Sequence, residues 1–508
     1  MARRHPWDPH PCLPMVPGPV SNGEFVPEAA SRRHRQVVAE TIAIADAAAR
    51  RLHMDRRRFL QSAGGMAALL SVLDLASCAE NASRSGQAAR PGGRYRVPPP
   101  DNLPACTHAL GSQNEFVFDG HTHHVMPQDP WAHNAPETVS LVLGMLPAGC
   151  AETNPLDCVN RAAYIHDVFV ASDTTVALLS DVPSSGPADA ALPFTDALAT
   201  QAMVAQLAHG GASRVLLHDV VAPNFGPLGA RLDDMSAQAS TGRVAAFKVY
   251  TAWGPGGRGF ALDDPSIGLP VVQRAHDLGV RVLCGHKGLP LMRFDLSHNG
   301  PADMVAVAKA FPDMQFVVFH SAWDPNRPEG PYDPANATSG VDSLLKALDD
   351  HGIAPNANVW ADLASTWRVL LSEPDQAAHV LGKLLSRVGE DRVLWGTDAI
   401  WYGSPQPQIM AFRAFEITPA FQETYGYPAL TEARKRKVLG LNGARLYGLD
   451  PEATRCALAA DAVTRAKEEH AALVRTTALP PPWRARGPIT RRQVVEWLRR
   501  SRAPWSPV

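Results

Sequence analysis

From residue 116 onward, short apolar runs alternate with longer segments whose apolar residues recur at helical spacing. The runs are rich in Val, Leu and Phe, and most are continuous rather than alternating, which is typical of parallel strands covered by helices on both faces. Eight runs are predicted as strands, at 116–120, 174–179, 214–218, 244–250, 280–285, 315–320, 358–363 and 392–396.

The segments between these strands predict helices, at 189–209, 265–278, 303–311, 341–351, 374–388 and 431–447. Strands that each lead through a helix or loop to the next predict an α/β fold, a (β/α)8 TIM barrel over 116–450. An open, doubly wound parallel sheet is the alternative. It is disfavoured because no Gly-x-Gly-x-x-Gly follows the first strand.

The N-terminal part of the chain has a different composition. Residues 1–53 are polar and proline-rich and then alanine-rich, and we interpret them as an N-terminal extension. Paired arginines before Phe-Leu and a mild apolar stretch make 54–78 resemble a twin-arginine export signal. Residues 79–115, rich in Ser, Gly, Arg and Pro, predict a linker. The alternative for 54–78 is a buried Ala/Leu helix preceded by a basic cap.

This interpretation predicts export by the twin-arginine machinery, with the protein in the periplasm or attached to the membrane. Cys78 follows Leu-Ala-Ser and resembles a lipidation site. If the export interpretation is wrong, a cytoplasmic location is expected, and the sequence does not choose between Met1 and Met54 as the start. Cys150 and Cys158 are near enough in sequence to form a disulfide after export, although two free thiols fit equally.

Residues 451–508 leave the barrel pattern and predict a C-terminal helical extension. After Pro480-Pro481-Pro482, the basic segment 490–501 has the spacing of an amphipathic helix. Docking on the barrel is the simplest expectation for it, and contact with a membrane surface or another subunit is the alternative.

Composition excludes several classes of protein. With 45% hydrophobic and 19% charged residues, the chain has the balance of a large packed core rather than of a disordered protein. Its formal net charge of −2 gives no reason to expect a nucleic-acid partner. No apolar stretch reaches the roughly 18–20 residues of a spanning helix, so a multi-pass membrane protein is excluded. Seven cysteines are too few for a disulfide scaffold.

Residues that bind metals gather at the predicted strand ends, where a barrel places its chemistry. His121 and His123 end the first strand and, two apart on an extended chain, point to the same side. His286 ends the fifth strand, His320 ends the sixth, and the eighth leads to Asp398. Imidazole nitrogen and carboxylate oxygen are ligands of zinc and related divalent ions, so the sequence predicts a metal site at this rim.

The order of these motifs resembles the amidohydrolase superfamily: His-x-His after strand 1, His after strands 5 and 6, and Asp after strand 8. The runs Phe-Asp-Gly-His-Thr-His, Val-Val-Phe-His and Val-Leu-Trp-Gly-Thr-Asp resemble its amidohydrolase-related branch, which contains aminocarboxymuconate-semialdehyde decarboxylase and other acid decarboxylases beside hydrolases. The similarity extends over 116–449. It implies His121, His123, His286 and Asp398 as metal ligands, and His320 as a histidine outside this set or on a second metal.

The resemblance also bears on Lys248, which lies on the fourth predicted strand. Binuclear relatives carry a carbamylated strand-4 lysine that bridges two metals, whereas this branch commonly holds one ion. One divalent ion, with zinc as the first choice, is therefore expected, and Lys248 is either a bridge or the partner of a nearby carboxylate. Asp119 is expected to support the histidine pair or to close the barrel floor.

These residues suggest a metal-dependent hydrolase. Zinc lowers the pKa of a water ligand to about 7, Asp398 would accept its proton and deliver it to the leaving group, and His320 would donate a hydrogen bond to the oxygen that gains charge. A non-oxidative decarboxylase needs the same residues and is the first alternative. A catalytically inactive, exported binding lipoprotein is the second.

Loop residues indicate the class of substrate. Aromatic side chains on the loops after the strands, among them Trp253, Trp401 and Tyr402, predict a site that encloses a small apolar or ring-bearing molecule. A carboxylate on that molecule could be held by one of three arginines, Arg258, Arg293 or Arg368. Whether the protein forms a homo-oligomer is left open.

Overall fold

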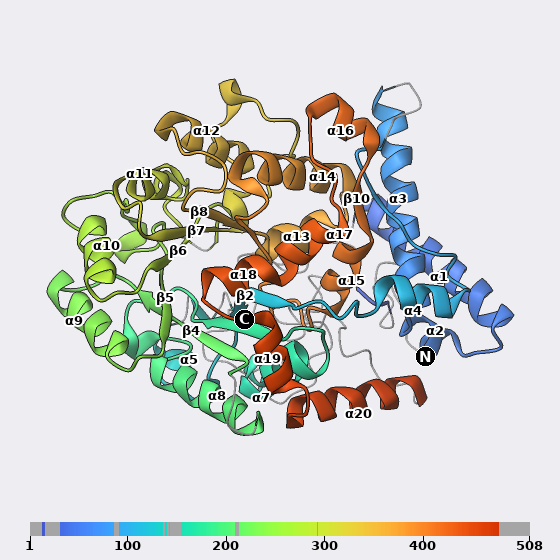
Figure 1. Ribbon diagram of the computed structural model, residues 1–508, viewed down its shortest axis with the longest axis horizontal. Coiled ribbons are helices and arrows are strands. Elements are labelled where there is room, and N and C mark those ends of the chain that lie inside the picture. Colours follow the sequence, from blue (N-terminus) through green and yellow to red (C-terminus); the bar gives the residue numbers. More distant parts are fainter. Residues whose placement is uncertain are drawn as a thin grey trace, which may run out of the picture.

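An eight-stranded parallel sheet forms the centre of the protein in the computed structural model (Figure 1). The residues described are 13–15, 31–85, 91–135, 138–139, 142, 154–208, 213–291 and 293–476. The strands of the sheet are neighbours in chain order: β2 (Phe118–His123), β3 (Val176–Ser180), β4 (Val215–Val221), β5 (Val244–Val249), β6 (Val282–His286), β7 (Gln315–Phe319), β8 (Val359–Asp362) and β9 (Val393–Leu394). Each predicted strand overlaps one of them.

The sheet closes on itself because β2 is also bonded to the chain that follows β9. The amide of Gly120 donates to the carbonyl of Trp395 at 2.9 Å, and the amide of Asp398 donates to the carbonyl of His121 at 2.9 Å. First and last strands are therefore joined, and the fold is the predicted (β/α)8 barrel rather than the open sheet.

Helices surround the barrel (Figure 1). They include α8 (Phe194–Leu207), α9 (Leu228–Ala239), α10 (Gly268–Asp277), α11 (Ala302–Ala310), α12 (Val341–His351), α13 (Ala364–Leu370), α14 (Pro374–Lys383), α15 (Gln406–Ala414) and α18 (Asn442–Leu446). Helices α9, α13 and α15 were not predicted. Helix α9 fully buries only Met235, whereas α13 and α15 are buried along nearly their whole length, so none of them shows a clear amphipathic pattern.

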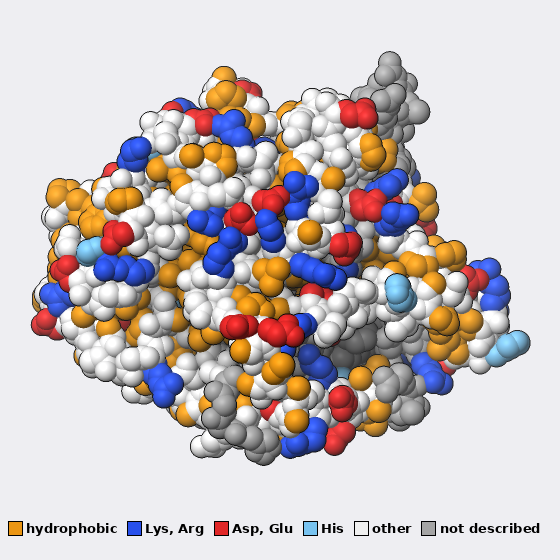
Figure 2. Space-filling view, in the orientation of Figure 1, with side chains coloured by type: hydrophobic (Ala, Val, Ile, Leu, Met, Phe, Trp, Pro, Cys, Tyr) orange, Lys and Arg blue, Asp and Glu red, His pale blue; other side chains and the backbone are white. Residues whose placement is uncertain are grey.

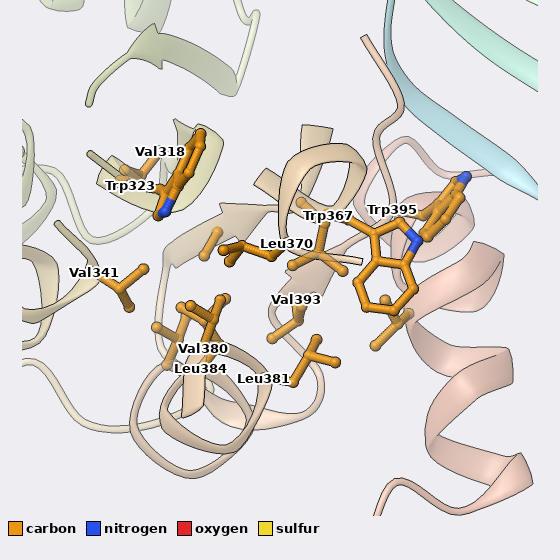
Figure 3. Packing of buried hydrophobic residues seen from close by; sticks show 14 of the residues in the cluster. Val318, Trp323, Val341, Trp367, Leu370, Val380, Leu381, Leu384, Val393 and Trp395 are labelled. Atoms are coloured by element: carbon orange, nitrogen blue, oxygen red, sulfur yellow. The ribbon is translucent and has the colours of Figure 1, made fainter. Parts of the chain in front are cut away.

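The largest apolar core lies between the barrel and its helices. Trp367 of α13 and Trp395 after β9 lie close together, and Val393, Val380 and Leu384 fill the space beside them (Figure 3). A second cluster inside the barrel takes side chains from β5 to β9. The barrel interior is thus closely packed, and the polar residues at the carboxyl ends of the strands are held by a rigid core.

Three N-terminal helices, α1 (Arg32–Arg51), α2 (Arg56–Leu60) and α3 (Ala63–Ser85), lie beside α15 and β10 (Phe415–Ile417) (Figure 1). The paired arginines belong to α2, and the apolar stretch belongs to α3. The buried α3 side chains of the main core are no more than 1% exposed: Met66, Ala67, Leu69, Leu70, Val72 and Leu73. The segment thus has the geometry of the alternative, a buried helix after a basic turn, while export stays a prediction. The side chain of Cys78 lies outside the described residues.

The predicted linker contains regular structure. Strand β1 (Gly93–Tyr95) pairs antiparallel with β10, and α4 (Leu103–Leu110) follows it. Tyr95 is buried, and its hydroxyl donates to the Leu371 carbonyl at 2.5 Å. Where it is described, the stretch from residue 91 to 115 is therefore fixed to the barrel rather than free.

The start of the C-terminal extension is docked on the barrel. Arg214, at the start of β4, forms a buried ion pair at 2.7 Å with Asp461, which lies between α19 (Pro451–Leu458) and α20 (Ala462–Thr476). The segment 490–501 lies outside the described residues, as does Cys150, whereas Cys158 is disulfide-bonded. On the face shown in Figure 2, basic and acidic side chains are interspersed. None of the helices within the described ranges is long and apolar enough to cross a membrane.

Candidate metal centre

The five residues predicted for the site meet in one cavity at the carboxyl ends of the strands. His121 and His123 end β2, His286 ends β6, His320 follows β7, and Asp398 follows β9. All five are buried, with exposed fractions between 1% and 7%. The carboxyl ends of parallel strands lie at one rim, which is why residues so distant in sequence come together.

Three of these residues form a compact donor group. Nε2 of His121 lies 3.7 Å from Oδ1 of Asp398, and Nε2 of His123 lies 3.4 Å from the same oxygen. The three ligand atoms all lie within 4.8 Å of one another. Tetrahedral ligands at 2.0–2.2 Å from zinc are separated by about 3.3–3.6 Å. The spacing and chemistry of the group therefore fit a divalent metal ion.

The far side of each imidazole fixes which nitrogen faces inward. Nδ1 of His123 donates to the Ser180 carbonyl at 2.8 Å, and Nδ1 of His121 donates to Oδ2 of Asp362 at 3.0 Å. Because a neutral imidazole carries one proton, the lone pair of each ring is then on Nε2, at the centre of the group.

His286 is held in the opposite sense. Its Nε2 lies 2.9 Å from the Leu289 carbonyl and donates to it, which leaves Nδ1 as the nitrogen with a lone pair. The ring lies in the same cavity, 4.5 Å from the ring of His320 between centroids. His286 is not part of the compact donor group, so the structure brings it to the site without bringing it into this triad.

Burial controls the protonation of the donor group. It lowers the pKa of His121 well below its ordinary value, helped by the charge of Lys248, and it lowers the pKa of His123 in the same way. Burial opposes ionisation of Asp398, but the neighbouring His123 and His320 and the hydrogen bond from Ser365 outweigh it and hold the pKa of that carboxyl below its usual range. Neutral imidazoles and an ionised carboxylate are the forms that bind metals.

Lys248 lies beneath this group and is fully buried. Its Nζ is 3.4 Å from Nε2 of His121 and 4.7 Å from the ring centroids of both Tyr250 and Phe319. Burial lowers the pKa of Lys248 to about 8. No carboxylate oxygen of the described residues lies within ion-pair distance of Nζ, so the expected carboxylate partner is not found there. Carbamylation stays a prediction.

Several contributors were missed by the sequence reasoning. Ser365 Oγ donates to Oδ2 of Asp398 at 2.5 Å and lies 2.8 Å from the hydroxyl of Tyr402. Asp362, bonded to His121, is the last residue of β8. The strand-end rule that found the histidines applies to Asp362 as well, whereas Ser365 and Tyr402 carry no sequence signal of this kind.

Asp119 has the supporting role expected of it. It is fully buried, and its carboxylate accepts from the Thr397 amide at 3.0 Å and from the Thr397 hydroxyl. The same carboxylate accepts from the His121 amide at 3.3 Å. Asp119 thus ties the strand of His121 to the segment that carries Asp398.

Apolar and aromatic side chains form the remaining wall of the cavity: Val182, Pro183, Tyr250, Leu289, Leu291, Trp401 and Tyr402. This agrees with the expectation of an apolar or ring-bearing ligand. Among the described residues that line the cavity there is no arginine. Arg258 and Arg293 are exposed, and the buried Arg368 lies over the ring of Tyr402 at 5.3 Å.

The family model described as Amidohydrolase matches residues 159–449, more than half of the chain. The chain belongs to the amidohydrolase family. The match confirms the branch that the motifs resembled, and it includes His286, His320 and Asp398. It begins after His121 and His123, so the place of these two residues in the site rests on the geometry above.

Solved structures with a similar fold have low sequence identity to this amidohydrolase family member. An uncharacterised TIM-barrel protein from Bordetella bronchiseptica is 14% identical with a TM-score of 0.41, over 65% of this chain and 98% of its own. A 5-carboxyvanillate decarboxylase from Sphingomonas paucimobilis is 15% identical (TM-score 0.41; 66% and 100%), and a 2,6-dihydroxybenzoate decarboxylase from Rhizobium is 14% identical (TM-score 0.38; 66% and 99%). No curated protein matched the chain.

Proposed function

We propose that the protein is a metal-dependent hydrolase of a small, ring-bearing molecule. The observation that carries the proposal is the convergence of Nε2 of His121, Nε2 of His123 and Oδ1 of Asp398 in one buried cavity. These residues, with His286 as a further ligand, would hold one Zn²⁺. That ion, when bound, supplies a Lewis acid that makes water nucleophilic near neutral pH.

The side chains around the centre have distinct tasks in this proposal. Asp398 is ionised and held by Ser365, so it is oriented to accept the proton of the attacking water and to return it to the leaving group. Burial lowers the pKa of His320 to about 4, so this histidine is neutral. Its Nδ1 has no hydrogen-bond partner among the described residues, which leaves it free to bond the oxygen that gains charge.

Decarboxylation is the second candidate, and the charge of the cavity wall favours it. No lysine or arginine side chain is among the described residues that line the cavity. The carboxylate of a ring-bearing acid would therefore find its cationic partner at the metal position, beside Asp398, and the ring would lie against Trp401 and Tyr402. Asp398 would then manage proton transfer at the carbon that loses carbon dioxide.

Metal analysis combined with two reactions tests these proposals. Purified protein is expected to hold about one zinc per chain and to cleave a phenyl ester such as 4-nitrophenyl acetate. The variants His121→Ala and Asp398→Ala should lose both metal and turnover, while His379→Gln, at a buried histidine that does not line the cavity, should keep both. Carbon dioxide released from a hydroxybenzoate without any hydrolysis would select the decarboxylase. Full metal and turnover in both alanine variants would overturn the site.

Export is also part of our proposal, because paired arginines precede an apolar helix. Cell fractionation with N-terminal sequencing tests it, and the packing of α3 predicts how cleavage would change stability. Cleavage before Cys78 would remove Met66, Leu69 and Leu70 from the main core, so a mature protein shortened there should be less stable than the full chain.

A further inference from the structure

We infer that Asp362 is a positioning residue of the candidate metal centre: one carboxylate sets the tautomer of His121 and holds the turn that carries His320. The inference rests on the proposed function and adds to it a residue that touches neither substrate nor the reacting atoms. In this inference one buried side chain aligns both the proposed metal ligand His121 and the proposed hydrogen-bond donor His320.

The two carboxylate oxygens of Asp362 serve different residues. The side chain is fully buried at the end of β8. Oδ2 accepts from Nδ1 of His121 at 3.0 Å, while Oδ1 accepts from the backbone amide of His320 at 2.5 Å. The ligand and the donor are thereby fixed relative to each other through one rigid group.

The first bond determines where His121 keeps its proton. Oδ1 of Asp362 accepts from the His320 amide, and with Oδ2 accepting from Nδ1 of His121 the ring keeps its hydrogen on Nδ1 and its lone pair on Nε2. That lone pair is the one directed to the group formed with His123 and Asp398. Without the carboxylate, the ring could place its proton on Nε2, where it would block metal binding.

The second bond stabilises a strained turn. His320, Ser321 and Ala322 have φ values of 59°, 54° and 58°, in the left-handed region that is strained for residues other than glycine. The carbonyl of Asp362 accepts from Ser321 Oγ at 2.5 Å, and Thr366 Oγ1 donates to the His320 carbonyl at 2.8 Å. With the amide bond to Oδ1, two of these three anchors belong to Asp362.

A ligand role is the alternative, because His121, His320 and Asp362 also form a compact donor group. The hydrogen bonds argue against it. Both carboxylate oxygens already accept from N–H donors, and one donor is the backbone amide of the strained turn. An ion at either oxygen would compete with a hydrogen bond that the carboxylate already accepts.

Asp362→Asn is the direct test, since its amide keeps one acceptor oxygen but presents an NH₂ to the other donor. For the metal-free protein titrated with Zn²⁺ against a chromophoric chelator, the zinc Kd should rise about 10–100-fold. At saturating zinc, kcat for hydrolysis of 4-nitrophenyl acetate should fall about tenfold or more. In a His320→Ala background, the same change should lower kcat less than about twofold, because Asp362 acts through His320.

The control is Asp342→Asn, which removes another buried carboxylate that does not line the cavity. It should lower the unfolding temperature while leaving the zinc Kd and kcat unchanged. Should Asp362→Asn fold poorly, Thr366→Val removes only the bond to the His320 carbonyl and should lower kcat without altering the zinc Kd. A wild-type zinc Kd in Asp362→Asn, or a loss of one of two bound zinc ions, would overturn the inference. Failure of the proposed function looks different, because the wild-type protein itself would then bind no zinc.

Discussion

Two buried clusters of polar side chains in this chain are built in opposite ways. In the first, Lys383 at the end of α14 lies 2.5 Å from Glu329 and 2.6 Å from Asp342. In the second, at the barrel mouth, Lys248 faces Nε2 of His121 at 3.4 Å, and the described part of the chain offers no carboxylate within ion-pair distance. Both lysines are almost completely buried.

The two clusters also differ in backbone strain, which is greater at the barrel mouth. The turn beside the Lys383 cluster reaches its positive φ at a glycine, Gly340, where the conformation costs little. At the mouth, His320, Ser321 and Asp398 have positive φ without being glycine. Strain and unpaired buried groups persist only where the surroundings impose them, and they concentrate at functional sites.

The comparison indicates that one cluster stabilises the fold and the other is arranged for a ligand. A buried cation with two carboxylate partners has its charge balanced within the protein and needs no further ligand. A group of neutral imidazoles and a carboxylate, beside a lysine with no carboxylate partner among the described residues, has its lone pairs directed at one point, and a metal ion is what would satisfy them. Substitutions in the two clusters should therefore have opposite effects on activity and on stability.

The largest effect is expected for Asp398→Asn. The amide keeps the shape of the carboxylate and the bond from Ser365 Oγ, but it can neither accept a proton nor bind a metal well. Turnover should fall about 10²–10⁴-fold, the range for loss of a positioned base, while the free energy of unfolding of the metal-free protein changes by less than about 1 kcal/mol. Steady-state kinetics and urea unfolding measure the two quantities. Unchanged turnover, or a large loss of stability, would remove the distinction between the clusters.

Lys383→Met should do the reverse. It leaves Glu329 and Asp342 buried without their cation, which is expected to lower the free energy of unfolding by about 3–5 kcal/mol. Metal content and turnover below the unfolding transition should match the wild type, because the cluster lies outside the cavity. Chemical denaturation with metal analysis of the folded fraction checks this, and a loss of metal would show that the two clusters are coupled.

Metal removal probes the second cluster alone. An ion that binds only the folded state at one hundred times its Kd stabilises it by about 2.7 kcal/mol, so chelation should lower the Tm by several degrees. Lys383→Met should retain this difference between metal-bound and metal-free protein, and His123→Ala should lose it. Thermal scans with and without a chelator give the result. An equal Tm in both conditions would mean that the donor group does not bind the ion under those conditions.

The sequence was sufficient to predict the barrel and the residues at its rim because both follow simple periodic rules. Continuous apolar runs gave all eight strands, and histidines or an aspartate at strand ends gave His121, His123, His286, His320 and Asp398. The same rule would have found Asp362, at the end of β8. It was overlooked because the resemblance gave no role to a carboxylate at that strand.

Other features depend on tertiary contacts that no local pattern encodes. Helix α3 has the composition of a mild export segment and also of a buried helix, and only its packing distinguishes the two shapes. Strand β1 is too short to be recognised and exists because it pairs with β10. The anchoring of Asp398 by Ser365 depends on how α13 leaves the barrel, which cannot be read from spacing.

A half-buried carboxylate outside both clusters provides the mildest test of the comparison. Asp219 on β4 lines a separate cavity with Arg231 and Asp234, and its carboxylate forms no hydrogen bond or ion pair with another described residue. Burial, and next the charge of Asp234, raise the pKa of Asp219 to about 8. In the unfolded chain the group ionises near pH 4. Asp219 therefore does not lower the free energy of unfolding below about pH 4, and its destabilising effect grows as the pH rises toward 8.

Asp219→Asn removes that destabilising effect. The variant should be more stable than the wild type, by at least about 1 kcal/mol more at pH 8 than at pH 5, as measured by urea unfolding at both pH values. Turnover should be unchanged, since the residue does not line the metal cavity. A loss of turnover would show that Asp219 is needed for activity although it lies outside the metal cavity. If the variant and the wild type differ in stability by the same amount at both pH values, the fold does not raise the pKa of Asp219.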